Sequence, residues 1–280
     1  MTNAKNVKAY YNTKESKLGY ILFLRGAKHF GYYERGDKMF QVSKALRKME
    51  RKIGKALDLP AKSNVLDAGS GMGTVSRNLV RWFDYSITGI DILDFNLAKA
   101  CREADKSANS NLSLHYLQMD YHNLSFKDST FDGVYTTETF VHASDPAKVL
   151  SEFYRVLKPG GKLVQLEYSH DPYDTMSSSE NRSFEFVNRY AAMPAFDLFE
   201  HGVHEKLIRD AGFKLISSTN HMKNIEPMLR WFMLNAWLPV KFIRLARIEH
   251  RFVNAISAVD FWKLRHKIHV KIIVAEKLAP

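Results

Sequence analysis

The sequence VLDAGSGMGTVS, residues 65–76, decides the fold of this chain because it joins a buried strand to a helix through a turn rich in glycine. The apolar residues before Asp67 are typical of a short buried strand, and a helical pattern resumes after Gly73 and runs to Phe83. Glycine accepts the left-handed backbone that such turns use, and it lets a ligand approach the backbone closely. The turn therefore predicts a bound nucleotide or nucleoside.

The spacing of the three glycines separates the classes of ligand. Gly69, Gly71 and Gly73 stand at every second position, whereas a dinucleotide fingerprint places its third glycine three residues after the second. Thr74 occupies that position here, and the lysine of a phosphate-binding loop is absent from the turn. The spacing disfavours a dinucleotide and ATP, and it favours close approach to a small amino-acid moiety. A turn with a purely structural role remains the alternative.

Strands and helices alternate through most of the chain. Residues 37–59 predict a helix that Asp37 caps and Pro60 ends. We expect strands at residues 63–69, 85–92, 112–120, 131–138 and 162–168, and helices at residues 74–83, 94–105 and 144–157. The segment KPGG turns the chain into the last of these strands. Further on we expect a helix at residues 204–212, a strand at 213–220, a long helical region at 225–265 and a final strand at 269–277. The pattern predicts an α/β fold, a doubly wound, Rossmann-like sheet of seven strands.

The same pattern divides the chain into three parts. Residues 1–59 form an N-terminal helical arm or lid, and residues 60–170 form the nucleotide-binding core. Residues 171–280 combine helical cap insertions with the strands that complete the sheet. Ligands of doubly wound sheets bind beyond the carboxyl ends of the strands, so the arm and the cap are expected to close over that edge.

The net charge of +11 is concentrated near the C-terminus. Residues 230–280 contain ten Lys and Arg residues but three Asp and Glu residues, interleaved with Trp and Phe. Such a region fits an anionic membrane surface or a phosphate group on the substrate, and the alternative is a solvated basic face over a pair of helices. No nucleic-acid-binding motif accompanies the charge, so we expect no nucleic acid partner.

Two features predict a cytoplasmic protein, and contact with a membrane surface stays open as an additional hypothesis. The single cysteine, Cys101, excludes an internal disulfide framework and fits a reducing compartment. The first residues lack the apolar core of a secretory signal. The histidine spacings match no metal site, so we expect no metal ion.

Acidic residues follow the second and third expected strands. Asp91 comes twenty residues after Gly71, where a carboxylate can accept hydrogen bonds from both hydroxyls of a ribose. Asp120 can accept a bond from an adenine amino group. The alternatives are a helix cap for Asp91 and a turn for Asp120.

Asp67 with the glycine turn, Asp91 and Asp120 together resemble class I S-adenosylmethionine-dependent methyltransferases over residues 60–170. RVLKPGGKL, residues 155–163, matches a further segment of that family. The resemblance implies S-adenosylmethionine as the cofactor and, for residues 269–277, an antiparallel strand inserted between its neighbours. It implies these contacts: Asp67, Gly69, Ser70, Gly71 and Gly73 with the methionine part, Asp91 and Ile92 with the ribose, and Asp120 and Tyr121 with the adenine.

Two segments bear on the methyl acceptor. VYTTETFVHASDP contains Glu138 and His142, and HFGYYERGDKMF contains Tyr33 and Glu34. Both resemble segments of sterol C24-methyltransferases and related prenyl-lipid C-methyltransferases, which implies catalytic roles for these four residues. The second segment lacks the tryptophan and the second glycine of the sterol family.

The leading prediction is therefore methylation of a lipophilic small molecule, at a carbon of a sterol or isoprenoid-type acceptor. Glu138 or His142 would accept a proton or stabilise a cation. One alternative is an O- or N-methyltransferase of a natural product, with His142 as the general base. Another is a non-catalytic protein that binds an adenosyl or nicotinamide nucleotide.

Overall fold

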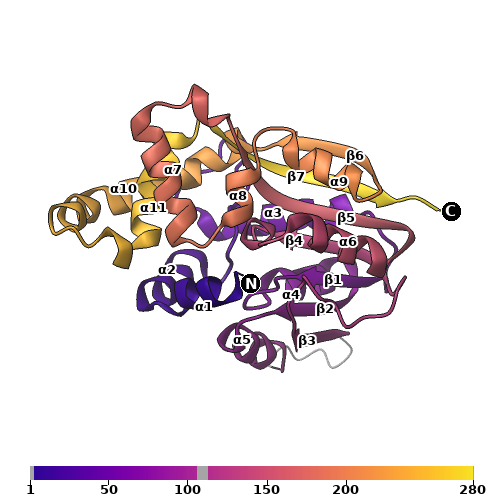
Figure 1. The fold of residues 1–280 in the computed structure, drawn as a ribbon. Helices are drawn as coiled ribbons and strands as arrows, with labels where there is room; N and C mark the ends of the chain where they lie inside the picture. The colour runs from indigo at the N-terminus through magenta and orange to yellow at the C-terminus, as the bar shows by residue number, and fades with distance from the viewer. Residues whose placement is uncertain (1–2, 106–112, 280) are drawn as a thin grey trace.

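Across residues 3–105 and 113–279, which the structure, a computed structural model, describes, the chain forms one seven-stranded sheet with helices on both faces (Figure 1). The order across the sheet is β3-β2-β1-β4-β5-β7-β6. The strands are β1 (Asn64–Ala68), β2 (Ser86–Asp91), β3 (Leu114–Gln118), β4 (Phe131–Thr137), β5 (Leu157–His170), β6 (Phe213–Asn220) and β7 (Ile268–Lys277). This confirms the doubly wound α/β fold.

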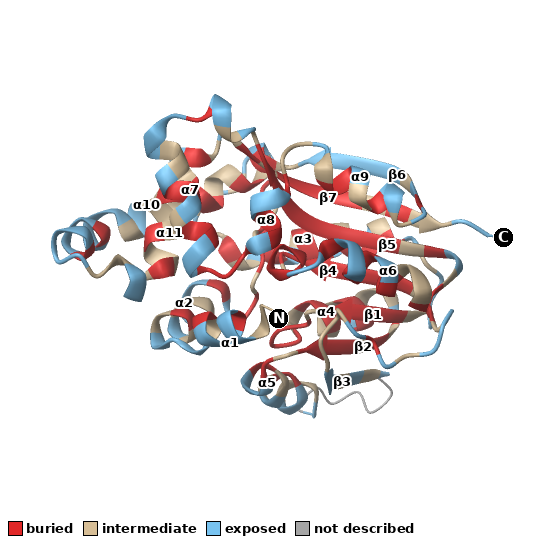
Figure 2. Ribbon diagram, viewed as in Figure 1, coloured by how far each residue is buried: buried red, intermediate tan, exposed pale blue. Residues whose placement is uncertain are grey.

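The last strand runs against its neighbours. β1 to β5 pair in parallel, whereas β7 is antiparallel to both β5 and β6. Its register places Val274 opposite Val164 on β5. The expected antiparallel insertion is therefore confirmed. The centre of the sheet is buried on both faces, as expected where helices cover both sides (Figure 2).

Helices connect the strands and build a cap beyond the carboxyl ends of the parallel strands (Figure 1). The helices are α1 (Ala4–Asn12), α2 (Lys14–Leu24), α3 (Val42–Leu57), α4 (Thr74–Phe83), α5 (Asp94–Asp105), α6 (Pro146–Val156), α7 (Ser178–Tyr190), α8 (Pro194–Leu198), α9 (Val203–Asp210), α10 (Met222–Leu245) and α11 (Val253–Leu264). The cap combines α1 and α2 with α7, α10 and α11. Chain segments at opposite ends of the sequence therefore surround the same edge of the sheet.

Two local predictions were wrong. Helix α3 begins at Val42, and Asp37 does not cap it, because that carboxylate accepts hydrogen bonds from the Glu34 N–H and from the ammonium groups of Lys44 and Lys48. The KPGG segment lies within β5 instead of preceding it. Its residues form a bulge, since the pairing of β5 with β4 shifts register in this region.

Candidate active site

Two cavities lie at the carboxyl ends of the parallel strands and share a wall. The smaller, of about 60 Å³, is lined mainly by residues that follow β1, β2, β3 and β4, and we call it the polar cavity. The larger, of about 460 Å³, lies among the cap helices, and we call it the apolar cavity. Four residues line both cavities: Tyr11, Lys28, Glu138 and His142. These four side chains form the wall between the cavities, and a molecule bound in one cavity would be near a molecule bound in the other at this wall.

The glycine turn is shaped by its backbone and by close packing. Gly69, Gly71 and Gly73 have φ of 93°, 54° and 70°, in the left-handed region that favours glycine. A Cβ atom at Gly69 would lie 2.3 Å from the Thr139 hydroxyl, and one at Gly73 would lie 2.1 Å from the Tyr116 hydroxyl. Gly69 and Gly71 line the polar cavity. Glycine at these positions therefore lets the turn and its neighbours approach one another.

Asp91 ends β2 with a buried carboxylate that lines the polar cavity. Its oxygens accept hydrogen bonds from Leu93 N–H (2.8 Å), Gly71 N–H (2.9 Å) and the Asn96 side-chain amide (3.1 Å). Burial raises the pKa of Asp91, and the positive charge of Lys28 acts in the opposite direction. These donors orient a carboxylate that has the geometry to bind a ribose diol. Asn96 was not anticipated, because a helical Asn gives no signal in the sequence.

Three of the predicted cofactor residues, Asp67 on β1 and Ser70 and Gly73 in the turn itself, do not line the polar cavity. Asp67 is buried, and its Oδ2 accepts a hydrogen bond from the Ser76 hydroxyl of α4. Burial raises the pKa of Asp67 to about 6. Asp67 Oδ1 and Ser70 Oγ have no hydrogen-bond partner within the described part of the chain. Gly73 occupies the N-cap position of α4.

The other predicted cofactor residues meet at the polar cavity. Ile92, Asp120 and Tyr121 line it together with Asp91. The Tyr121 hydroxyl donates a hydrogen bond to a backbone carbonyl, and the Asp120 carboxylate lies 2.6 Å from Nδ1 of His122. The structure therefore gathers residues from the ends of β2 and β3 around one small space.

Glu138 follows β4 and points into the wall between the cavities. It is a non-glycine residue with a φ of 55°, a strained conformation that is common at functional sites. Its carboxylate accepts hydrogen bonds from the Phe30 N–H and the Tyr168 hydroxyl. Burial raises the pKa of Glu138 to about 7. Tyr168 was missed, although its position near the carboxyl end of β5 is the signal that could have identified it.

A second buried carboxylate supports the turn that carries Glu138. Glu167 Oε1 accepts hydrogen bonds from the N–H groups of Thr139 (3.1 Å) and Phe140 (2.9 Å) and from the Thr136 hydroxyl (3.0 Å). Burial raises the pKa of Glu167 to about 8. Glu167 therefore fixes the backbone on both sides of Glu138.

Both ring nitrogens of His142 have partners. Its Nδ1 lies 2.8 Å from the carbonyl oxygen of Ala192, and its Nε2 lies 3.0 Å from the Tyr11 hydroxyl. A carbonyl only accepts hydrogen bonds, so Nδ1 carries the proton and Nε2 accepts from Tyr11. Burial lowers the pKa of His142 to about 4. The ring is neutral near pH 7 and holds Tyr11 in the wall.

Tyr33 and Glu34 lie away from the cavities. The Tyr33 hydroxyl donates to the backbone carbonyl of Met39, and the exposed Glu34 carboxylate pairs with Lys48. Neither residue lines the polar or the apolar cavity. From the same segment it is His29 and Phe30 that line the apolar cavity.

Lys28 is a wall residue that sequence reasoning missed, because a single lysine in the arm matches no motif. Its ammonium group donates to Asn96 Oδ1 at 3.0 Å and lies 4.0 Å from the centre of the Tyr11 ring. Burial lowers the pKa of Lys28 to about 8, and the negative charge of Asp91 opposes this shift. A cation thus stands at the junction of the two cavities.

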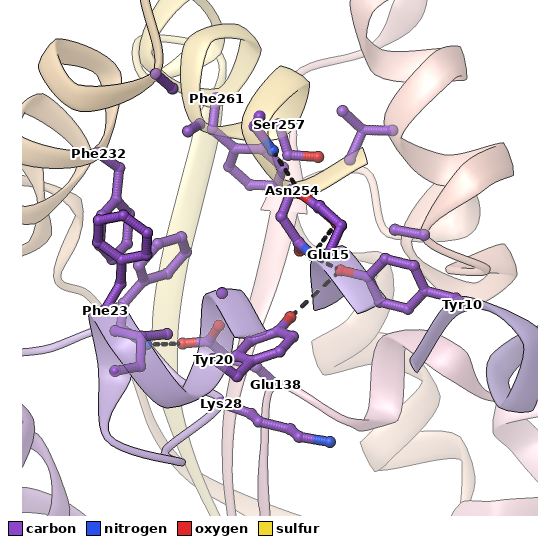
Figure 3. A pocket seen from close by; sticks show the side chains of 18 of the residues that line it. Tyr10, Glu15, Tyr20, Phe23, Lys28, Glu138, Phe232, Asn254, Ser257 and Phe261 are labelled. Atoms are coloured by element: carbon purple, nitrogen blue, oxygen red, sulfur yellow. Dashed lines mark hydrogen bonds between the residues drawn. The ribbon is translucent and has the colours of Figure 1, made fainter. Parts of the chain in front are cut away.

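The lining of the apolar cavity is mostly aromatic and aliphatic, and its polar side chains include two hydrogen-bonded groups (Figure 3). One is the pair Glu138 and Tyr168. The other joins Tyr20, Tyr10, Asn254 and Glu15 through hydrogen bonds from α2 and α1 to α11. Within residues 3–105 and 113–279, no cluster of His, Cys, Asp and Glu is arranged to hold a metal ion. The cavity suits a lipophilic molecule with few polar groups.

The sequence is similar to those of known proteins. Residues 66–165 match the model of a methyltransferase domain. The chain is 34% identical, over 90% of its length and 87% of the relative, to the S-adenosyl-L-methionine-dependent Diels-Alderase iccD of Talaromyces variabilis. It is 31% identical, over 84% of its length and 64% of the relative, to the sterol 24-C-methyltransferase erg6 of Aspergillus fumigatus.

The fold also matches solved structures. The mycolic acid cyclopropane synthase CmaA1, whose structure contains SAH and CTAB, superimposes with a TM-score of 0.82 over 98% of both chains at 18% identity. The 34% sequence identity over 87% of a relative, the matching domain and the shared fold lead to one conclusion. The chain belongs to the class I S-adenosylmethionine-dependent methyltransferase family.

Proposed function

We propose that this protein is a cytoplasmic enzyme that transfers the methyl group of S-adenosylmethionine to a carbon atom of a lipophilic small molecule of sterol or isoprenoid type. The observation that carries the proposal is the shared wall between the cavities, which contains Glu138. A polar cavity with strand-end carboxylates suits the cofactor, and an apolar cavity of about 460 Å³ suits the acceptor.

The polar cavity fits the proposed cofactor. Asp91 would bind the ribose, and Asp120 with Tyr121 would lie against the adenine. Gly69 and Gly71 would bring their backbone close to the methionine part. Asp67 would support the turn from β1, and Ser70 and Gly73 would shape the turn from within. Asp67 Oδ1 and Ser70 Oγ have no hydrogen-bond partner within the described part of the chain.

Bound S-adenosylmethionine supplies an electrophilic methyl group, and an alkene that accepts it is left with a positive charge on carbon. Glu138 would stabilise that charge and accept the proton that leaves from the neighbouring carbon. A carboxyl with a pKa of about 7 is well matched to proton transfer at neutral pH. Tyr168 and Phe30, which also line the apolar cavity, would add aromatic stabilisation for a cation. No step in this scheme calls for a metal ion.

The remaining predicted catalytic residues take supporting roles in this proposal. His142 would position Tyr11, because both of its nitrogens are engaged and its pKa is low. This also weakens the alternative in which His142 is the general base of an O- or N-methyltransferase. Tyr33 and Glu34 would hold the arm in place through Met39 and Lys48.

A second candidate function is cyclisation of a lipophilic substrate with S-adenosylmethionine bound but not consumed. The similarity to a Diels-Alderase over 90% of the chain favours it. Both functions use the same two cavities. They differ in whether Glu138 is needed as a base, since a cycloaddition transfers no proton.

Isotope-labelled S-adenosylmethionine tests the proposal directly. The purified protein is incubated with sterols, prenyl diphosphates and phenolic lipids, and the products are analysed by mass spectrometry and by the position of the label. Label on product carbon, with release of S-adenosylhomocysteine, supports C-methylation, and label on oxygen or nitrogen contradicts it. An isomer of unchanged mass that forms only with the cofactor present supports cyclisation.

A matched variant tests whether Glu138, in the wall between the cavities, takes part in the reaction. Glu138→Gln keeps the shape of the side chain but cannot accept a proton, so turnover should fall by about 10²–10⁴-fold. Calorimetry with S-adenosylhomocysteine should show unchanged affinity. Equal turnover in this variant would remove Glu138 from the chemistry.

A further inference from the structure

Helix α10 exposes large apolar side chains along its outer face. Leu234, Trp237, Leu238, Phe242 and Leu245 have exposed fractions from 50% to 83%. Their spacing of three or four residues places them on one face of the helix. We call these five residues the outer face of α10. Large contiguous apolar patches are uncommon on monomeric proteins and mark contact sites.

The opposite face of the same helix lines the apolar cavity. Phe232, Ala236 and Pro239 belong to the cavity lining, and they lie about half a turn away from the outer face. Helix α10 is therefore apolar on both sides. A helix with this character is normally covered on both sides by protein or lipid. No helix within residues 3–105 and 113–279 has the length and apolarity needed to cross a bilayer, so α10 would lie along a surface.

Helix α2 continues the apolar surface to the entrance of the cavity. Leu18, Leu22 and Phe23 are 57%, 71% and 49% exposed, and all three also line the apolar cavity. Figure 3 shows Phe23 of α2 beside Phe232 of α10 at the same cavity. The apolar cavity is thus lined by exposed side chains of α2 and by the inner face of α10.

The charges around this surface are mostly positive. Arg230, Lys241, Arg247 and Arg251 are exposed on α10 and just after it, and the acidic residues of this segment are Glu226 and Glu249. The Lys241 ammonium lies 3.7 Å from the centre of the Trp237 ring. A tryptophan paired with a lysine, beside leucine and phenylalanine, is the composition of helices that lie in the interface of an anionic bilayer.

We propose that the outer face of α10 and the exposed side chains of α2 dock into an anionic membrane leaflet, so that the apolar cavity opens toward the lipid. The basic side chains lie at the level of the headgroups, and the leucines and aromatic rings insert below them. A lipophilic acceptor then enters the cavity without crossing water. Membrane docking itself is independent of the reaction, and only this entry route rests on the proposed function.

The test is sedimentation of the full-length protein with vesicles of phosphatidylcholine alone or mixed with phosphatidylserine. The protein should pellet with the mixed vesicles at low salt, and high salt should release part of it because screening weakens the charge attraction. The double variant Leu238→Glu with Phe242→Glu should weaken the partition about tenfold or more. Phe40→Glu and Leu278→Glu, which change exposed apolar residues elsewhere, should leave it unchanged.

Two outcomes of the vesicle assay overturn the proposal. One is a wild-type protein that does not pellet with the mixed vesicles, and the other is a double variant that pellets as well as the wild type. A dimer in sedimentation velocity that the double variant dissociates, without vesicle binding, would instead assign the face to a second copy of the chain and also overturns it. Calorimetry with S-adenosylhomocysteine serves as the folding control for every variant. If the wild type does not bind S-adenosylhomocysteine, the proposed function is contradicted, and the conclusion from the vesicle assay is unaffected.

Discussion

The hydroxyl of Tyr168 on β5 donates a hydrogen bond to the carboxylate of Glu138, the residue that follows the neighbouring strand β4. Burial raises the pKa of Glu138 to about 7, and this hydrogen bond restrains the rise. The tyrosine thus adjusts the proton affinity of a carboxylate that stands between the two cavities.

Tyr168→Phe should shift the pH dependence of turnover. If Glu138 acts as a base, turnover rises with pH as the carboxyl ionises near pH 7. Loss of the hydrogen bond raises this pKa further, so the acid limb of the profile should move up by about one pH unit. Tyr20→Phe is the control, because its hydroxyl contacts Tyr10 and not Glu138. An unchanged acid limb in Tyr168→Phe would contradict the role of the hydroxyl.

Glu167→Gln should make stability less dependent on pH. Burial raises the pKa of Glu167 from 4.5 to about 8, so the folded chain binds more protons than the unfolded chain across this window. The contribution of Glu167 to stability is therefore greatest below about pH 4.5 and is lost as pH rises through about 8. The glutamine keeps an oxygen for the N–H groups of Thr139 and Phe140.

The measurement is thermal or urea unfolding at mildly acidic and at alkaline pH. From acidic to alkaline pH, the free energy of unfolding of the glutamine variant should rise relative to that of the wild type, by on the order of a few kcal/mol. The same difference in stability at both pH values would show that Glu167 is not held protonated.

Lys28→Met should change how the protein discriminates between charged and neutral forms of the cofactor. The ammonium group of Lys28 stands in the wall of the proposed cofactor cavity, and a sulfonium there would be repelled by it. In the variant, the ratio of the affinity for S-adenosylmethionine to the affinity for S-adenosylhomocysteine should therefore rise about fivefold to tenfold. The wild-type ratio should shift in the same direction as pH rises through about 8.

Calorimetry with both ligands over a range of pH provides this measurement. Lys17→Met is a control that removes a more distant cation, which lies over the Phe95 ring. If the ratio in Lys28→Met equals that of the wild type, the lysine does not sense the charge of the cofactor.

Gly69→Ala should damage both stability and cofactor binding. The added Cβ would collide with the Thr139 side chain, and φ at this position is 93°. We expect a loss of about 1–3 kcal/mol from the backbone alone, with more from the collision. Gly36→Ala is a matched control, since φ there is 92° and no atom lies within 4 Å of the added Cβ. Equal losses in the two variants, measured by urea unfolding, would argue against the close contact.

Local signals in the sequence were sufficient for the fold and for part of the site. The alternation of strands and helices depends on side-chain periodicity, and the glycine turn depends on backbone conformation, so each can be recognised within a short segment. Asp91 and Glu138 could be placed at one edge of the sheet because they come at the ends of predicted strands, and the ends of parallel strands meet there. The direction of β7 came from the family resemblance.

Tertiary packing decided the rest. Phe30 lies 108 positions before Glu138, yet its N–H reaches that carboxylate because the arm folds across the ends of the strands. The same path of the arm brings Lys28 into the wall and leaves Glu34 outside it.

The sequence by itself therefore determined the sheet, the glycine turn and the strand-end carboxylates, because periodicity and backbone conformation are local properties. Only the tertiary structure decided the partners of Glu138 and His142, the place of Lys28 and the exposed outer face of α10. Proton affinity and exposure depend on neighbours that are distant in the chain, and no spacing within a segment encodes them.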